Sequence, residues 1–232
     1  MLTHIRAALA SAALVFTPAA HAATQDPIET NAKALIARFD TALKACGVTP
    51  PYTPGVVIDS APSLVSFYFK DKSVHLSRWS EMPPFVHDLL TGWAAAGTLG
   101  LTPEGQFAEI FNSLLVPHEL GHFAQSINGH SETLDFWTSE VEANRIAIAF
   151  WSLEPADAEK IAARVENFNV FLAGLPNPVP QGEDPHAYFE ANYEKLSNDP
   201  AAYGWYQGAF MRAAWAEKDK ADFCALVNPP KP

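Results

Sequence analysis

The chain is poor in cysteine and in basic residues, and each shortage excludes a class of protein. Two cysteines in 232 residues are too few for a disulfide-framework scaffold or for a Cys-rich zinc module. Only 15 Lys and Arg residues stand against 26 Asp and Glu residues, and the basic residues form no run. Nucleic acids and anionic membranes both attract clustered basic side chains, so we expect neither as the main partner.

Long hydrophobic runs are also scarce, and the one notable run lies at the N-terminus. Residues 1–22 combine Arg6 with an apolar stretch over 7–16 and with Ala20-His21-Ala22, which fits the small-x-small rule for signal-peptide cleavage. The stretch is too short to span a bilayer, which needs about 20 residues. We therefore expect a signal peptide over 1–22 and a mature chain that is periplasmic or secreted and has no membrane span.

The rest of the composition is that of a globular protein. The chain is 48% hydrophobic and 18% charged, and it is long enough for one domain with a sizeable core, which we expect over 23–232. Export to an oxidising compartment favours a disulfide between the two cysteines, Cys46 and Cys224.

Helical periodicity dominates the mature chain, so we expect a single, mainly helical α+β domain. Asp26-Pro27 begins the first predicted helix and Gly47 ends it. Two β-rich runs over 64–69 and 74–79 predict an antiparallel hairpin, and a weaker strand is expected over 56–59. Further helices are predicted from 84 to 96, from 103 into the segment around 118, and over 138–153, 156–173, 186–196, 200–217 and 220–226.

The segment His118-Glu119-Leu120-Gly121-His122 matches the pattern HExxH. On a helix, two histidines four residues apart lie on one face and can bind one Zn²⁺. Glu119 lies about 100° around the helix, so its carboxylate can take a proton from a water molecule on the metal without ligating the metal. Pro117 removes one helical hydrogen bond and predicts that the helix restarts just before His118. Gly121 has no side chain, so another element can pack closely against this helix.

A catalytic zinc site needs a third protein ligand. The metzincin pattern fails, because it requires Gly and His where this chain has Gln125 and Asn128. Glu140 is the best candidate, because Asn144 lies one turn further on the same helical face and can hydrogen-bond a ligating His from behind. The remaining candidates for the third ligand are Glu142, His130 and Asp135.

These residues resemble the gluzincin group of zinc metallopeptidases, in which a Glu on the next helix is the third ligand and a polar residue four positions later supports a His. The matching residues are His118, Glu119, His122, Glu140 and Asn144. The resemblance covers about residues 100–153. It implies a zincin-like fold with the hairpin near the HExxH helix, one Zn²⁺, and hydrolysis of a peptide or protein. Many relatives carry Asp at the position of Asn144, so the His ligand here is expected to be less basic.

Two further expectations concern the substrate. A tetrahedral oxyanion needs a hydrogen-bond donor, and the candidate donors are Tyr203, Tyr206, His186 and His130. Residues 74–79 either pair with an extended substrate by strand addition or serve as a plain scaffold hairpin. The alternative function is a non-catalytic protein on the same fold that binds zinc, a peptide or a glycan. Glu119 favours the enzyme, because zinc storage alone would not need it.

Overall fold

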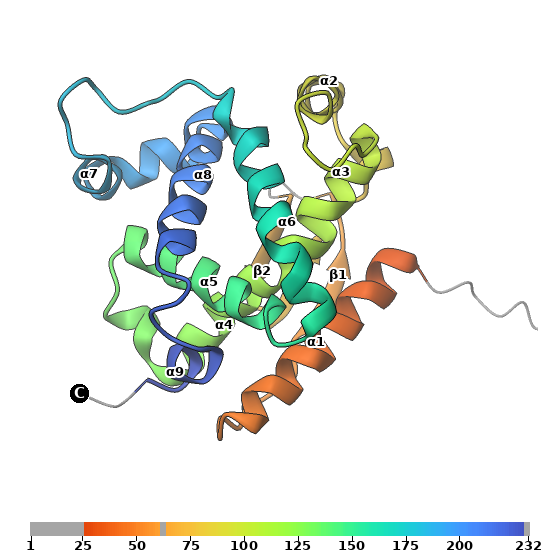
Figure 1. The fold of residues 1–232 in the computed structure, drawn as a ribbon, viewed down its shortest axis with the longest axis vertical. Helices are drawn as coiled ribbons and strands as arrows, with labels where there is room; N and C mark the ends of the chain where they lie inside the picture. Colours follow the sequence, from red (N-terminus) through yellow and green to blue (C-terminus); the bar gives the residue numbers. More distant parts are fainter. Residues whose placement is uncertain (1–25, 61–63, 230–232) are drawn as a thin grey trace, which may run out of the picture.

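The structure is a computed structural model that describes residues 26–60 and 64–229 (Figure 1). Of these residues, 65% are helical, and a small three-stranded sheet accompanies the helices. The expected mainly helical α+β class is thereby confirmed. The predicted signal peptide over 1–22 lies outside the described residues.

The elements follow the predicted segments closely. The α-helices are α1 (Pro27–Ala45), α2 (Pro84–Ala94), α3 (Pro103–Glu109), α4 (Val116–Asn128), α5 (Phe136–Trp151), α6 (Pro155–Ala173), α7 (Pro185–Ser197), α8 (Pro200–Ala216) and α9 (Phe223–Val227). The strands are β1 (Gly55–Ile58), β2 (Val65–Tyr68) and β3 (Ser73–Leu76). Short turns of 3₁₀ or π helix are η1 (Trp79–Glu81), η2 (Ile110–Leu114) and η3 (His130–Glu132).

Side-chain caps explain why the helix starts can be read from the sequence. The carboxylate of Asp26 accepts a hydrogen bond from the backbone N–H of Ile28 at 2.8 Å, and Pro27 follows as the first helical residue. A capping side chain and a proline at the first position need no distant partner. The same kind of cap begins five further helices, at Thr102, Asp135, Asp184, Asp199 and Asp222.

The sheet has the strand order β1-β3-β2. The predicted hairpin joins β2 to β3 in antiparallel pairing, and the predicted weaker strand, β1, pairs parallel with β3. The second β-rich run is shorter than expected, because Trp79 begins η1. The expectation that residues 74–79 receive a substrate strand is wrong, since β3 already has a strand on each edge. Within the described residues, β2 pairs with β3, and no further strand pairs with the outer edge of β2.

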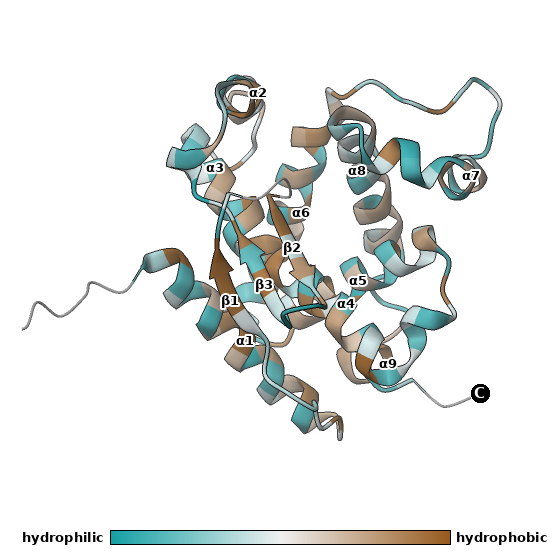
Figure 2. Ribbon diagram, turned by 180° about the vertical axis from the view of Figure 1, so that it is seen from behind, coloured by the Kyte–Doolittle hydropathy of each residue, from teal (hydrophilic) through white to brown (hydrophobic). Residues whose placement is uncertain are grey.

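Helices pack on one another and on the sheet to form the core. α1 packs against β1, while α4 packs against β2, β3 and α5, and Figure 2 shows the sheet lying in front of these helices. A second, smaller hydrophobic cluster joins α7 and α8, and its buried residues are Phe189, Leu196, Ala202, Tyr206 and Phe210. No described helix combines the length and the apolar character needed to cross a membrane.

A disulfide joins the end of the first helix to the last helix of the described chain. Cys46 follows α1 and is bonded to Cys224 on α9, with 5.0 Å between their Cα atoms, so the predicted pairing is confirmed. α9 in turn packs against α4 and α5. The disulfide therefore ties α1 to a helix that braces the two helices on which the HExxH histidines and Glu140 lie.

Loss of this disulfide should lower the free energy of unfolding. The crosslink spans 178 positions, and closing so long a loop restricts the unfolded chain, which is typically worth about 2–5 kcal/mol. We expect the double variant Cys46→Ser/Cys224→Ser to be destabilised by about that amount in urea titrations followed by circular dichroism. The control is wild type under reducing conditions, which should match the variant. Equal stability of oxidised and reduced wild type would contradict the prediction.

α4 and α5 approach each other closely at Gly121. A Cβ atom built on Gly121 would lie 2.9 Å from the Cα of Ala143, 3.0 Å from its backbone oxygen and 3.2 Å from its Cβ. The first two atoms are backbone and cannot swing aside as a flexible side chain can. Gly121 is therefore required for the present distance between the two helices.

Gly121→Ala should destabilise the protein, because α4 and α5 would have to move apart. Overpacking of this kind costs about 1–3 kcal/mol. Gly92→Ala is the matched control, since it also lies inside a helix but its added Cβ would meet nothing within 4 Å. We expect Gly92→Ala to raise the free energy of unfolding by up to about 1 kcal/mol. Denaturant titrations measure both changes, and equal effects at the two sites would refute the packing argument.

Candidate metal centre

The start of α4 positions the HExxH residues. The π-helical turn η2 ends at Leu114, and α4 begins at Val116 with Pro117 in its first turn. The helix thus restarts just before His118, as predicted. Because the first N–H groups of a helix have no partner within it, proline costs no hydrogen bond there. His118 and Glu119 consequently lie in the first turn of α4.

His118, His122 and Glu140 converge on one point. The Nε2 atom of His118 lies 3.4 Å from Oε2 of Glu140, and Nε2 of His122 lies 3.8 Å from Oε1 of Glu140. All three ligand atoms lie within 4.8 Å of one another. Tetrahedral zinc with bonds of 2.0–2.1 Å would hold its ligand atoms about 3.3 Å apart. Two imidazoles and one carboxylate in this arrangement fit a zinc ion after small side-chain rotations.

The charges within this cluster stabilise one another. Burial alone would raise the pKa of Glu140, but the hydrogen bond from His118 and the charges of His122 and His118 lower it to about 2. Burial alone would lower the pKa of His118, but its hydrogen bond to Glu140 and the charge of Glu119 raise it. Glu140 therefore stays ionised at neutral pH, which is the form that ligates a metal.

Gln125 orients His122 by a hydrogen bond to its Nδ1 atom. Its Oε1 atom lies 3.0 Å from Nδ1 of His122, while its Nε2 atom donates to the backbone oxygen of Ser139 at 2.8 Å. The Ser139 hydroxyl also donates to Oε1 of Gln125, at 3.1 Å. Gln125 therefore accepts from Nδ1–H of His122, which leaves the lone pair of Nε2 for a metal. The sequence pattern does not single out Gln125, and the only signal for it is its position three residues after His122.

Asn144 lies behind His118, where the sequence places a polar support. Its Nδ2 atom donates to the backbone oxygen of Glu140 at 3.0 Å. Its Oδ1 atom and Nδ1 of His118 are both buried, and neither reaches a hydrogen-bond partner within the described ranges. The Asn144 side chain nevertheless helps to raise the pKa of His118. A slightly shorter distance between these two atoms would let Nδ1–H of His118 donate to Oδ1 of Asn144, and both atoms would then have a partner.

Glu119 is buried beside the cluster but is not one of its ligands. Its Oε2 atom accepts a hydrogen bond of 2.8 Å from the backbone N–H of Phe67. Phe67 lies on β2, opposite Val74 of β3, so this N–H points away from β3. Glu119 therefore contacts the edge of β2 that is turned away from β3.

Two side chains of α8 reach the same carboxylate from the opposite side. The hydroxyl of Tyr203 donates to Oε1 of Glu140 at 3.1 Å, and Nε2 of Gln207 donates to Oε2 at 3.2 Å. Burial and the charge of Glu140 raise the pKa of Tyr203 well above its ordinary value, so this hydroxyl stays protonated. Tyr203 is thus the one expected oxyanion donor that contacts the cluster. Gln207 is a contact that the sequence signals only by its spacing of one turn from Tyr203.

Tyr206 was expected as another oxyanion donor, and the structure places it elsewhere. Its side chain is fully buried in the cluster between α7 and α8, and its hydroxyl donates to the backbone oxygen of Pro185 at 3.3 Å. Tyr206 therefore cannot reach a substrate at the metal centre without unpacking that cluster.

The remaining candidate ligands and donors pair with one another instead of joining the cluster. His130 lies 3.2 Å from a carboxylate oxygen of Glu142. His186 lies 2.9 Å from a carboxylate oxygen of Asp135. The expectations of His130 and His186 as oxyanion donors, and of Glu142, Asp135 and His130 as third ligands, are corrected accordingly.

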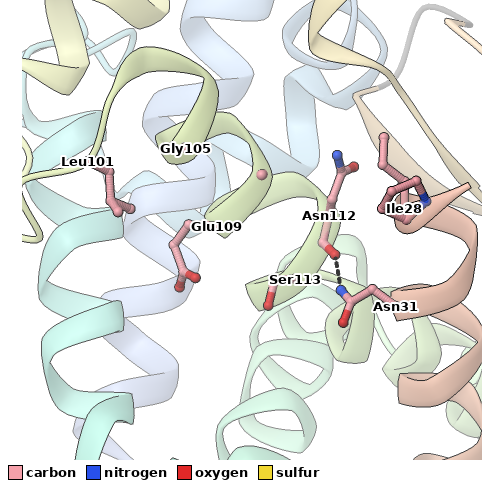
Figure 3. Close-up of a pocket in the computed structure, with 9 residues that line it drawn as sticks. Ile28, Asn31, Leu101, Gly105, Glu109, Asn112 and Ser113 are labelled. Carbon is pink, nitrogen blue, oxygen red and sulfur yellow. Dashed lines mark hydrogen bonds between the residues drawn. The ribbon is translucent and has the colours of Figure 1, made fainter.

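A pocket of about 410 Å³ lies apart from the metal centre, between the first turn of α1 and the α3–η2 segment (Figure 3). The amide of Asn31 donates to the backbone oxygen of Asn112 across it, at 2.9 Å. Glu109 is its only acidic lining residue, and this carboxylate is paired with Arg164. The pocket thus offers no set of metal ligands.

Comparisons of the chain with protein-family models, with curated proteins and with solved structures found no match. The resemblance to gluzincins therefore remains a prediction from the residues that carry it. What the chain does must be inferred from the geometry of the site.

The two supports behind the histidines should tune metal affinity. Removing such a partner typically weakens binding by about 10–100-fold, and we expect this for Gln125→Ala and for Asn144→Ala. The control is Glu142→Gln, which removes a nearby carboxylate that pairs with His130 and should change little. Competition with a chromophoric zinc chelator measures all three variants. If Glu142→Gln weakens zinc binding as much as the other two, the assignment of the supports is wrong.

Proposed function

We propose that the protein is an exported zinc hydrolase, and more specifically a metallopeptidase of gluzincin type with a zincin-like fold. One observation carries the proposal. His118, His122 and Glu140 meet with their ligand atoms within 4.8 Å of one another, and Glu119 lies beside them with its carboxylate bound to a backbone N–H instead. This is the division of roles that hydrolysis by activated water requires.

His118, His122 and Glu140 would hold the zinc. A zinc ion in this position supplies a Lewis acid that lowers the pKa of water and polarises a carbonyl group. Glu119 is the general base of the proposal. Its hydrogen bond from Phe67 engages Oε2 and fixes the carboxylate, and we assign the other oxygen as the proton acceptor.

The outer edge of β2, which is turned away from β3, is the proposed docking site for a peptide substrate. In an antiparallel pair, alternate residues turn their backbone groups away from the partner strand. The hydrogen bond from Phe67 to Glu119 shows that this outward edge faces the base. An extended peptide laid along this edge would therefore lie next to Glu119. The N–H of Phe67 already donates to Glu119, so it would not pair with the peptide.

Tyr203 is the proposed donor to the oxyanion. Its hydroxyl already donates to a carboxylate oxygen at the cluster, and its raised pKa keeps the proton on the phenol. A donor of this kind stabilises charge that develops on the carbonyl oxygen during hydrolysis. The Cys46–Cys224 disulfide supports export, because such bonds persist in oxidising compartments.

Glu119→Gln separates catalysis from binding. The substitution removes the proton acceptor but no ligand, so we expect unchanged zinc content and a loss of hydrolysis of about 10²–10⁴-fold. His122→Ala should lose both zinc and activity. The matched control is Glu132→Gln, which alters an exposed carboxylate on η3 and should leave both unchanged. Zinc content by mass spectrometry and cleavage of a quenched fluorescent peptide library are the two readouts.

Two outcomes would overturn the proposal in different ways. Full activity of zinc-loaded Glu119→Gln would show that the mechanism is wrong. Zinc-loaded wild type that cleaves no member of the library would favour the alternative, a non-catalytic protein that binds zinc, a peptide or a glycan on this fold.

A further inference from the structure

A second convergence of metal-binding groups lies outside the centre described above. Asp135, His186 and Glu190 bring their ligand atoms within 4.8 Å of one another. His186 and Glu190 lie one turn apart on α7, the same spacing that joins the two histidines of HExxH. Asp135 is the N-cap residue of α5. Two elements that are distant in the chain thus contribute to one group of ligands.

Each of the three side chains is held in place by a contact of its own. Oδ1 of Asp135 accepts from the backbone N–H of Thr138 at 2.7 Å, which leaves Oδ2 facing Nε2 of His186 at 2.9 Å. Oε1 of Glu190 accepts from the backbone N–H of Trp137 at 2.6 Å. The ring of His186 stacks on the indole of Trp137, with 5.2 Å between their centroids. Ligands fixed in this way lose little freedom when an ion binds.

The cluster also lacks a positive charge. It contains two carboxylates and one imidazole, and in the described part of the chain neither carboxylate forms an ion pair with Lys or Arg. A divalent cation would supply the positive charge that these two carboxylates lack among the described Lys and Arg side chains.

We propose that Asp135, His186 and Glu190 bind a second divalent transition-metal ion, which fastens α7 to the start of α5. One imidazole and two carboxylates are suitable ligands for zinc and for similar ions. The side chains of His186 and Asp135 are 41% and 43% exposed, so an ion can enter from solvent and water can complete its coordination. This exposure makes the second site weaker than the buried centre.

The position of α7 explains what such an ion does. Figure 1 shows α7 at the periphery, after a long connection from α6. Residues 175–185 hold four prolines, the last of which, Pro185, begins α7. α7 packs against α8 through the second hydrophobic cluster, and α8 carries Tyr203 and Gln207, which hold Glu140. An ion between α5 and α7 would therefore stabilise the position of α7. Because α7 packs on α8, it would also stabilise the helix that contacts Glu140.

The test is a titration of metal-stripped protein with zinc alone, followed by calorimetry and by mass spectrometry. Wild type should bind two equivalents, the second more weakly than the first. His186→Ala should bind only the tighter equivalent. The double variant His118→Ala/His122→Ala should bind only the weaker one, and zinc should raise its midpoint of thermal unfolding. His130→Ala is the matched control, because it breaks a His–carboxylate pair that has no third ligand, and it should keep both equivalents.

Glu190→Gln is a second test of the site that does not depend on whether His186→Ala folds. It keeps an acceptor for the N–H of Trp137 but removes the charge, so the weaker equivalent should bind about 10–100-fold less tightly. A single equivalent in wild type that His186→Ala leaves intact would overturn the second site. So would a second equivalent that survives both His186→Ala and Glu190→Gln. Failure of the main centre is distinguishable, because zinc binding would then be insensitive to His118→Ala/His122→Ala and still sensitive to His186→Ala.

Discussion

The contact between Gly121 and Ala143 determines where every ligand of the metal centre lies. Two histidines come from α4 and the carboxylate comes from α5, so their distance depends on how closely the two helix backbones approach. The nitrogen–oxygen distances of 3.4 and 3.8 Å are near the separation of about 3.3 Å expected around tetrahedral zinc. A spacing wider by the size of one methyl group would take Glu140 out of reach. The absence of a side chain at Gly121 is thus as important to the site as the ligands themselves.

Glu140 is the electrostatic centre of the site. A carboxylate with little access to water is costly unless other groups replace its hydration, and here two helices do so. α4 supplies the two histidines, while α8 supplies Tyr203 and Gln207. The opposite pKa shifts of His118 and Glu140 show that the cluster attracts positive charge. A divalent ion meets that demand more fully than a proton does.

The features that could be predicted from the sequence depend on neighbours within a few residues. Helix starts follow from local caps, the HExxH face follows from helical spacing, and the disulfide follows from there being only two cysteines. The strand order β1-β3-β2 could not be predicted, because it depends on the parallel pairing of β1 with β3. Tyr203 and Tyr206 share a helical face in sequence, and only the packing of α8 decides which of them meets Glu140. The pairing of His186 with Asp135 spans 51 positions and leaves no local signal.

The bond between Cys46 and Cys224 encloses the whole site in a covalent ring. All three ligands, the base and both α8 contacts lie between the two cysteines. A single cut by a protease anywhere in that ring, including the proline-rich connection before α7, leaves the two fragments joined. The nicked protein can therefore keep its fold and its site through packing, since neither half can diffuse away. If the protein is exported as proposed and meets proteases there, such a ring lets it keep its structure after one backbone cut.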